Sequence, residues 1–344
     1  MDWNLLTSFV DKTLVDPSKI HLEHRKRNIR SKYDYISIRV KIDQYEYVFS
    51  RFSLSRYLMA CMVPPSQAVD ISRKIKEEYV DQQKFVITQE ELTQRVFELI
   101  SNFDNSPLTQ KRFRLIQNFN LERIPLIIFI SGTGFLGKSN LAFQLAERLN
   151  ISTILQTDIV CALTSSSGDH LGRSLWYTRH NSTEEFMELY RKSCEIAKKG
   201  IEGDIFKTLT DGKPLIVEGI HLIPDLFLQL CGSNALNNLD GFNKSVFGKQ
   251  PRGKQGFILP ILLTRKKQDI LNSINSSIFG STEKRKMNLD VSAIVNYALT
   301  IQNELIKKFP PEFIIDCSGT DAINHIHSVF LENLENYYSQ HENN

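Results

Sequence analysis

This chain of 344 residues has few cysteines and no strong excess of positive or negative charge. The five cysteines are an odd number, and no two of them stand at the spacing of metal ligands. The sequence therefore predicts neither a disulfide framework nor a zinc site, and it favours a reduced, cytoplasmic protein. The formal net charge is only +3, which is too small to favour nucleic acid or an anionic membrane as a partner.

Long apolar runs are absent as well. No uninterrupted apolar stretch approaches the length of a membrane span, so a transmembrane protein is not expected. The N-terminus reads Met1-Asp2-Trp3-Asn4 and has no basic region followed by an apolar run, so no signal peptide is predicted.

The composition that remains is that of a globular protein with room for two domains. Hydrophobic residues make up 41% of the chain and charged residues 24%, which are ordinary values for a chain that buries a sizeable core. The residue pattern changes near residue 120. We therefore expect a polar arm over residues 1–29, a small, mostly helical module over 30–120, and an α/β domain over 121–344.

The module over 30–120 is predicted to combine a hairpin with helices. Apolar and aromatic residues alternate on both sides of Asp43-Gln44, which predicts two strands and a turn within 33–49. Thr88 is placed to cap one of the helices that follow. The predicted helices cover 54–62, 65–82, 89–103 and 107–121.

The domain over 121–344 alternates strands with helices. Five short apolar runs predict strands at 125–130, 153–156, 214–218, 257–263 and 312–316. One long helix begins with capping-box spacing at Ser182, and another covers about 290–309 before two prolines. This alternation predicts a parallel sheet covered on both faces. The stretch 231–256, rich in Gly, Asn and Lys, breaks the pattern and is expected to be a surface insertion.

Residues 132–139 carry the most informative motif. They read G-T-G-F-L-G-K-S, which fits the phosphate-binding pattern of glycine, four residues, glycine, lysine and serine or threonine. A predicted strand precedes the motif and a helix follows it, so backbone N–H groups can wrap a phosphate at the positive end of the helix. Lys138 is expected to reach the β- and γ-phosphates, and Ser139 to ligate Mg²⁺. The predicted nucleotide-binding residues are Gly132, Thr133, Gly134, Phe135, Leu136, Gly137, Lys138, Ser139 and Asn140.

Three more candidates follow strands of the same predicted sheet, where ligands collect. Asp158 is placed to take a proton from an attacking hydroxyl, and its position suits a helix cap equally well. Glu218 is placed to hold the hydration shell of Mg²⁺ or, alternatively, to act as a structural hydrogen-bonding partner. His221 is a candidate contact for a substrate phosphate, against the commoner structural role of a histidine at a strand end.

Basic residues in three segments are candidates for balancing phosphate charge. The stretches 265–267 and 283–286 suit a mobile lid, with Arg285 as its most plausible cation, and suit an ordinary solvated surface equally well. Arg179 lies between Asp158 and the long helix, together with Arg173 and His180. This loop is expected to border the acceptor site, which makes Arg179 a candidate for binding an anionic substrate.

The order of three segments resembles the 2-phosphoglycerate kinase family, most closely its eukaryotic, plant-type P-loop relatives. The segments are 154–158 (ILQTD), 199–204 (KGIEGD) and 211–224 (DGKPLIVEGIHLIP). The resemblance runs from about residue 33 to about residue 335. It includes the N-terminal module, where 49–56 and 68–75 are similar to the ATP-cone-like domain of that family.

The resemblance implies a fold and an activity. The fold is the nucleoside-kinase type of P-loop NTPase, with the strand that begins at residue 153 at an edge of the sheet. The activity is ATP- and Mg²⁺-dependent transfer of the γ-phosphate to a small, anionic substrate that bears a hydroxyl, such as 2-phosphoglycerate. By the same resemblance, Asp158 is the acid on the acceptor side and Glu218 the acid on the metal side.

The sequence departs from the family pattern at Phe135, where the family usually has glycine. If the backbone there has positive φ, a bulky residue costs about 1–2 kcal/mol, which can weaken ATP binding. A nucleotide-binding regulatory protein without catalysis is therefore an alternative. A kinase acting on inositol phosphates is another. A polynucleotide kinase or RNA-associated ATPase is disfavoured by the near-neutral charge.

Overall fold

The computed structural model describes residues 32–103, 107–164, 175–177, 180–230, 257–279, 290–319 and 321–341. The chain divides into two compact units. The first consists of residues 1–55 and 65–106, and the second of residues 56–64 and 107–344. The helix α7 (Pro107–Glu122) belongs to the second unit. The predicted insertion at 231–256 lies outside the described residues.

The first unit is built on a three-stranded sheet in the order β2-β1-β3. The predicted hairpin is confirmed: β1 (Arg39–Ile42) pairs antiparallel with β2 (Tyr45–Val48) around Asp43, whose φ is +48°. A third strand, β3 (Val86–Thr88), pairs in parallel with β1 and was not predicted. The helices of this part are α3 (Lys32–Tyr35), α4 (Arg51–Ala60), which runs into the second unit, α5 (Pro65–Asp81) and α6 (Gln89–Ser101).

Local signals explain where α6 begins. The Oγ1 atom of Thr88 accepts a hydrogen bond from the backbone N–H of Glu91 at 3.2 Å, as the sequence predicted for a cap. Glu90 and Glu91 place negative charge in the first turn, which the helix dipole favours. Val40 and Ile87 are buried on one face of the sheet, and α6 contacts both of their strands.

The second unit contains a five-stranded sheet in the order β5-β6-β4-β7-β8, and every neighbouring pair is parallel. The strands are β4 (Leu126–Ser131), β5 (Ile154–Gln156), β6 (Leu215–Gly219), β7 (Phe257–Thr264) and β8 (Ile314–Asp316). All five predicted strands are present, and β5 lies at an edge as expected. The first strand stands at the centre and the next two lie on one side of it, so the predicted P-loop fold of nucleoside-kinase type is confirmed.

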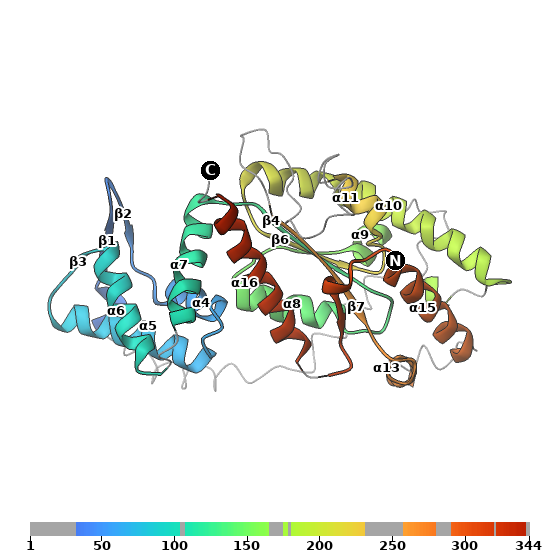
Figure 1. Ribbon diagram of the computed structural model, residues 1–344, viewed down its shortest axis with the longest axis horizontal. Coiled ribbons are helices and arrows are strands. Elements are labelled where there is room, and N and C mark those ends of the chain that lie inside the picture. Colours follow the sequence, from blue (N-terminus) through green and yellow to red (C-terminus); the bar gives the residue numbers. More distant parts are fainter. Residues whose placement is uncertain are drawn as a thin grey trace, which may run out of the picture. The chain divides into compact units, whose positions relative to one another are not determined.

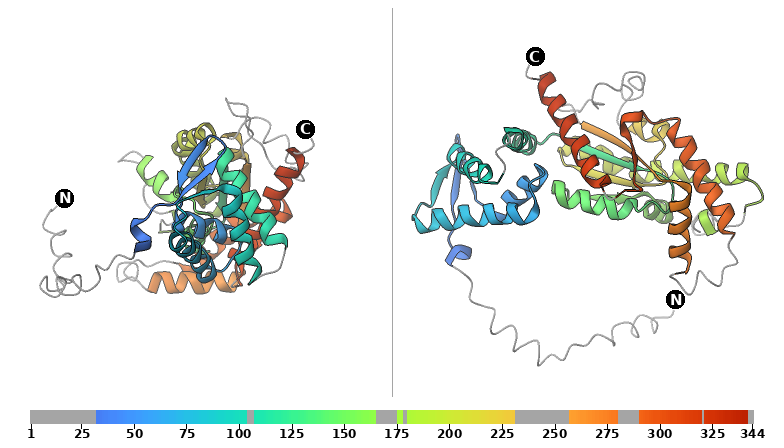
Figure 2. Two further views of the ribbon diagram at one scale, coloured as in Figure 1. Left: turned by 90° about the vertical axis from the view of Figure 1, so that its left-hand side faces the viewer. Right: turned by 60° about the horizontal axis from the view of Figure 1, so that its bottom comes forward.

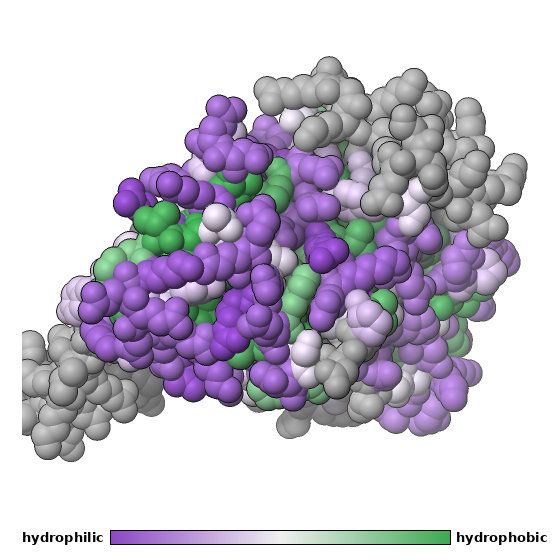
Figure 3. Space-filling model, turned by 60° about the vertical axis from the view of Figure 1, so that its left-hand side comes forward, coloured by the Kyte–Doolittle hydropathy of each residue, from purple (hydrophilic) through white to green (hydrophobic). Residues whose placement is uncertain are grey.

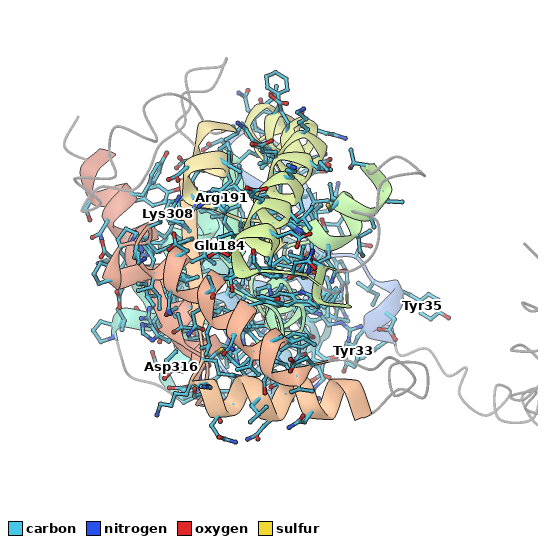
Figure 4. The ribbon with its side chains drawn as sticks, turned by 90° about the vertical axis from the view of Figure 1, so that its right-hand side faces the viewer. Tyr33, Tyr35, Glu184, Arg191, Lys308 and Asp316 are labelled. Atoms are coloured by element: carbon cyan, nitrogen blue, oxygen red, sulfur yellow. The ribbon has the colours of Figure 1, made fainter. Side chains whose placement is uncertain are left out.

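Helices cover both faces of this sheet (Figures 1 and 2). On one face lie α8 (Lys138–Leu149) and α16 (Ala322–His341), and α7 packs against α16. On the other lie α10 (Thr183–Asp211) and α15 (Val291–Ile306), with α9 (Thr157–Thr164) and α11 (Pro224–Leu230) against α10 and α13 (Lys267–Phe279) against α15. Figure 4 shows Glu184 and Arg191 on α10 and Asp316 at the end of β8.

The core between the sheet and α10 is apolar and rich in aromatic rings. Phe129 of β4 and Phe186 of α10 are fully buried, and Tyr190 is 2% exposed. Burying each such side chain stabilises the fold by about 1.5–3 kcal/mol. Ser182 caps α10 by accepting a hydrogen bond from the N–H of Glu185 at 3.2 Å, which confirms the predicted start of the helix, while Oε2 of Glu185 accepts from the N–H of Asn181 at 2.7 Å rather than from that of Ser182.

On the face drawn in Figure 3, hydrophilic side chains predominate and hydrophobic ones gather in patches. Within the described ranges, no helix combines the length and the apolar character needed to cross a bilayer.

Candidate active site

The loop between β4 and α8 has the backbone of a phosphate-binding loop. Gly132 has φ +146°, and a Cβ atom there would lie 2.7 Å from the carbonyl oxygen of Leu263 on the neighbouring β7. Gly137 has φ +80° and is the N-cap residue of α8, where no side chain caps the helix. The first N–H groups of α8 are thus left without a capping side chain, at the end of the helix where an anion is favoured.

Lys138 is folded back over this loop. Its side chain is 7% exposed, and its Nζ atom donates a hydrogen bond to the carbonyl oxygen of Thr133 at 2.7 Å. Burial lowers the pKa of Lys138, and the nearby carboxylates of Asp158 and Glu218 act in the opposite direction. A phosphate in the loop would add negative charge beside the ammonium group and would favour its charged form.

Ser139 and Glu218 form the acidic side of the site. The Oγ atom of Ser139 donates to Oε1 of Glu218 at 2.7 Å, and Glu218 is 3% exposed at the end of β6. Burial raises the pKa of Glu218, while the hydrogen bond from Ser139 and the charge of Lys138 lower it. The pairing joins residues that are 79 positions apart in the chain.

Asp158 and His221 meet beside this pair. Asp158 lies in the first turn of α9 with its side chain 64% exposed, and its Oδ1 atom is 3.5 Å from Nδ1 of the buried His221. The same Nδ1 atom lies 2.9 Å from Oγ1 of Thr157. Burial lowers the pKa of His221 to about 4, and although Asp158 opposes this shift, the imidazole is uncharged at neutral pH.

A close approach of the Gly219 backbone to the side chain of Thr157 brings these acids together. Gly219, with φ +154°, follows Glu218, and any Cβ atom at Gly219 would overlap Oγ1 of Thr157. Only glycine permits this contact between the end of β6 and the start of α9. Asp158 and Glu218 consequently lie at the same edge of the sheet as Lys138, and all three influence one another electrostatically.

Phe135 has φ +66°, which is the positive backbone angle considered in the sequence analysis as a cost for a bulky residue at this position. Its ring packs against Trp176 with the two centroids 5.4 Å apart at 64°. Its carbonyl oxygen lies 3.5 Å from Nη1 of Arg265. Sequence reasoning missed Trp176, because nothing in the spacing connects it with the loop. It also considered Arg265 as part of a lid, whereas the structure places its guanidinium against the loop itself.

The other predicted cations have different outcomes. Arg179 and Arg285 lie outside the described residues, as does Arg173, so their roles stay predictions. His180 is described and takes part in an aromatic cluster, with its ring centroid 5.2 Å from that of Phe186. Its Nε2 atom lies 3.0 Å from the carbonyl oxygen of Leu175.

Curated proteins with similar sequences are named 2-phosphoglycerate kinases. No family model matches the chain. A 2-phosphoglycerate kinase of Methanococcus maripaludis strain C5 is 27% identical over 305 residues, which cover 81% of this chain and 96% of the relative. A 2-phosphoglycerate kinase of Methanococcus vannielii is 29% identical and is covered to 91%, with 77% of this chain aligned.

Solved structures align with part of the chain. A gluconokinase from Sinorhizobium meliloti 1021 gives a TM-score of 0.37 at 13% identity, covering 63% of this chain and 98% of the gluconokinase. A shikimate kinase from Bacteroides thetaiotaomicron gives a TM-score of 0.33 at 12% identity, covering 61% and 98%. The resemblance noted in the sequence motifs is confirmed by the curated relatives: this chain is similar to the 2-phosphoglycerate kinases over most of its length and is a phosphotransferase with the P-loop kinase fold.

Proposed function

We propose that this protein transfers the γ-phosphate of ATP to a hydroxyl group of 2-phosphoglycerate or of a similar phosphorylated metabolite. The observation that carries the proposal is the meeting of four groups at one edge of the sheet. Lys138 and Ser139 begin the helix after the central strand, Glu218 lies near the end of the neighbouring β6, and Asp158 lies in the first turn of α9, which follows β5. The match to the 2-phosphoglycerate kinases supports the choice of acceptor.

The loop is proposed to bind the β- and γ-phosphates of ATP. Gly132 and Gly137 give the backbone the shape that turns N–H groups towards a phosphate, and the start of α8 adds positive potential. Lys138 now donates to a carbonyl oxygen of its own loop, a weaker acceptor than a phosphate oxygen. We expect its ammonium group to move from Thr133 to the phosphates when ATP binds.

Ser139 and Glu218 suit a hard divalent cation. Mg²⁺ prefers oxygen ligands, and here the hydroxyl oxygen of Ser139 and a carboxylate oxygen of Glu218 lie 2.7 Å apart. Within the described part of the chain no three His, Cys, Asp or Glu side chains cluster as a metal cage, which fits an ion held mainly by water and phosphate. We propose that Ser139 ligates Mg²⁺ and that Glu218 orders its water, while the ion offsets negative charge on the phosphates.

Asp158 is proposed to receive the proton of the acceptor hydroxyl. Its carboxylate is exposed enough to meet a substrate, yet it is near the buried Lys138. The neutral imidazole of His221 lies behind it and can limit the rotation of the carboxylate without competing as a positive charge. Arg179 and Arg285 are proposed to bind the acceptor's own phosphate and the transferring group.

The first experiment is ADP release from purified protein with Mg-ATP, in the presence and absence of 2-phosphoglycerate. Lys138→Ala serves as the blank, because it removes the ammonium group that the phosphates need. Stimulation by 2-phosphoglycerate that the blank lacks supports the proposal. No stimulation by 2-phosphoglycerate, combined with stimulation by an inositol phosphate, would support a kinase with another acceptor and would overturn the acceptor proposed here.

A further inference from the structure

Phe135 is held from two sides, and this is unusual for a loop of this kind, in which small residues predominate. Its ring contacts Trp176, and its carbonyl oxygen accepts a hydrogen bond from Arg265 at 3.5 Å. The left-handed backbone at φ +66° disfavours a bulky side chain, so contacts outside the loop must offset that cost. The ring and the carbonyl contact different parts of the unit.

Through Trp176, the ring of Phe135 is in contact with aromatic side chains near the start of α10. The Trp176 ring lies 5.8 Å from that of Phe186, and Phe186 stacks on Tyr297 of α15 with centroids 4.2 Å apart at 10°. His180 contacts both of these rings. Contact between loop and indole is tight, because a Cβ atom at Gly134 would lie 2.8 Å from Cζ2 of Trp176. A displacement of the loop at residues 134–135 must therefore displace the indole.

Through Arg265, the carbonyl group of Phe135 is connected to the ends of β7 and β8. Arg265 follows β7, and its guanidinium also donates to Oγ of Ser273 at 3.0 Å and to the carbonyl oxygen of Cys317 at 3.3 Å. The backbone of Arg265 is fixed in turn by Gln302, which accepts from its N–H at 2.9 Å and donates to its carbonyl at 3.1 Å. One side of Phe135 is thus fastened to the sheet, and the other contacts the aromatic cluster.

We infer that Phe135 and Trp176 are positioning residues that couple the phosphate loop to the segment before α10, so that nucleotide binding changes both the surroundings of the Trp176 indole and the affinity for the acceptor. The part that concerns the acceptor rests on the proposed function. A glycine at position 135 would remove the ring contact and leave only the contact of the Gly134 backbone with the indole. Phenylalanine makes the loop and the cluster move as one body.

The experiment uses Trp176 as its own reporter. The chain has two tryptophans, Trp3 and Trp176, so Trp3→Phe leaves a single indole in this chain. Mg-ADP and a non-hydrolysable ATP analogue are titrated while the fluorescence is recorded, and calorimetry measures nucleotide affinity independently. We expect a saturable fluorescence change at the nucleotide concentration that calorimetry gives. Binding by calorimetry with an unchanged fluorescence signal would overturn the inference.

Substitutions at Phe135 separate coupling from simple packing. Phe135→Leu removes the ring and is expected to bind nucleotide with a smaller fluorescence change than the parent, whereas Phe135→Tyr is expected to keep the full change. Phe143→Leu is the matched control, because Phe143 is 56% exposed on α8 and has no part in the site. A fluorescence change in Phe135→Leu equal to that of the parent would show that the ring does not transmit it.

The acceptor arm is measured separately. The ATP analogue is expected to tighten binding of 2-phosphoglycerate by about fivefold or more in the parent and to have little effect in Phe135→Leu. Equal tightening in both proteins would overturn the coupling. A fluorescence change that depends on the Phe135 ring, without any phosphate transfer, would support the coupling between loop and indole and would reject the proposed function. Failure of the parent to bind nucleotide at all would reject both.

Discussion

Asp158 is the residue whose proposed role is tested most sharply by a single substitution, because its exposed carboxylate is proposed to receive the proton of the acceptor hydroxyl. Asp158→Asn keeps the size of the side chain but removes its ability to accept a proton. We expect turnover to fall by about 100-fold or more while nucleotide affinity stays within about threefold. Steady-state ADP release and calorimetry with Mg-ADP measure the two quantities. Unchanged turnover would remove Asp158 from the mechanism.

Glu218 is expected to act through the metal ion. Glu218→Gln preserves an oxygen that can accept the hydrogen bond from Ser139 but removes the negative charge. The variant should therefore need more Mg²⁺ for half-maximal turnover, and its maximal turnover should fall. The measurement is a Mg²⁺ titration of ADP release. Glu188→Gln removes the same charge from an exposed position of α10 and should leave the titration unchanged.

The sequence predicted some of these residues and could not predict others. Lys138, Ser139 and Glu218 were accessible because a local motif and the ends of buried strands identify them without any knowledge of distant contacts. The contacts of Trp176 and Arg265 with Phe135 were not, because these residues lie 41 and 130 positions further along the chain, although Arg265 had been considered as part of a lid. The positive φ of Phe135 was foreseen, but the contacts that accompany it were not.

Three glycines, two within α10 and one that caps its C-terminal end, test how this helix packs. A Cβ atom at Gly200 would overlap Val160 of α9, and one at Gly212, which caps the helix at φ +67°, would overlap the carbonyl oxygen of Arg123. Gly203 is exposed and has open space around it. Alanine should lower Tm at positions 200 and 212 and raise it at 203, where the gain in stability is about 0.5–1 kcal/mol. The opposite order of the three Tm values would contradict the packing described here.

Elements with a strong apolar or periodic signal were predicted, and one strand of the smaller sheet was not. β4, β6 and β7 are apolar runs buried on both faces, and α10 has both a cap at Ser182 and a long apolar stripe. Strand β3 was missed because it has three residues, of which only Ile87 is buried, and because its partner β1 is distant in sequence. Pairing of that kind depends on tertiary contacts.

Two buried histidines predict how the stability of the whole molecule depends on pH. Burial lowers the pKa of His221 and that of His327 to about 4, from an ordinary value of 6.5. Between these values the unfolded chain binds more protons than the folded chain, so stability is lost as the pH falls from 6.5 towards 4. Each imidazole is expected to lower the free energy of unfolding by on the order of 1–2 kcal/mol when the pH falls from about 7 to about 5.

The variant His327→Gln isolates one of these contributions. His327 lies on α16, and its Nε2 atom is 2.8 Å from the carbonyl oxygen of Ala60, a position from which a glutamine amide can donate to the same oxygen. The free energy of unfolding, measured by urea denaturation at about pH 7 and pH 5, should fall less in the variant than in the parent. Equal losses in both proteins would show that His327 does not titrate in this way.

The most direct test of the central claim is to detect the transferred phosphate. The intact protein is incubated with ATP, Mg²⁺ and 2-phosphoglycerate, and ³¹P NMR follows the nucleotide and the acceptor together. The account predicts that a second phosphomonoester signal appears on the acceptor in step with ADP, and that neither forms with Lys138→Ala. ADP accompanied only by inorganic phosphate would contradict the account, because the site would then pass the phosphate to water.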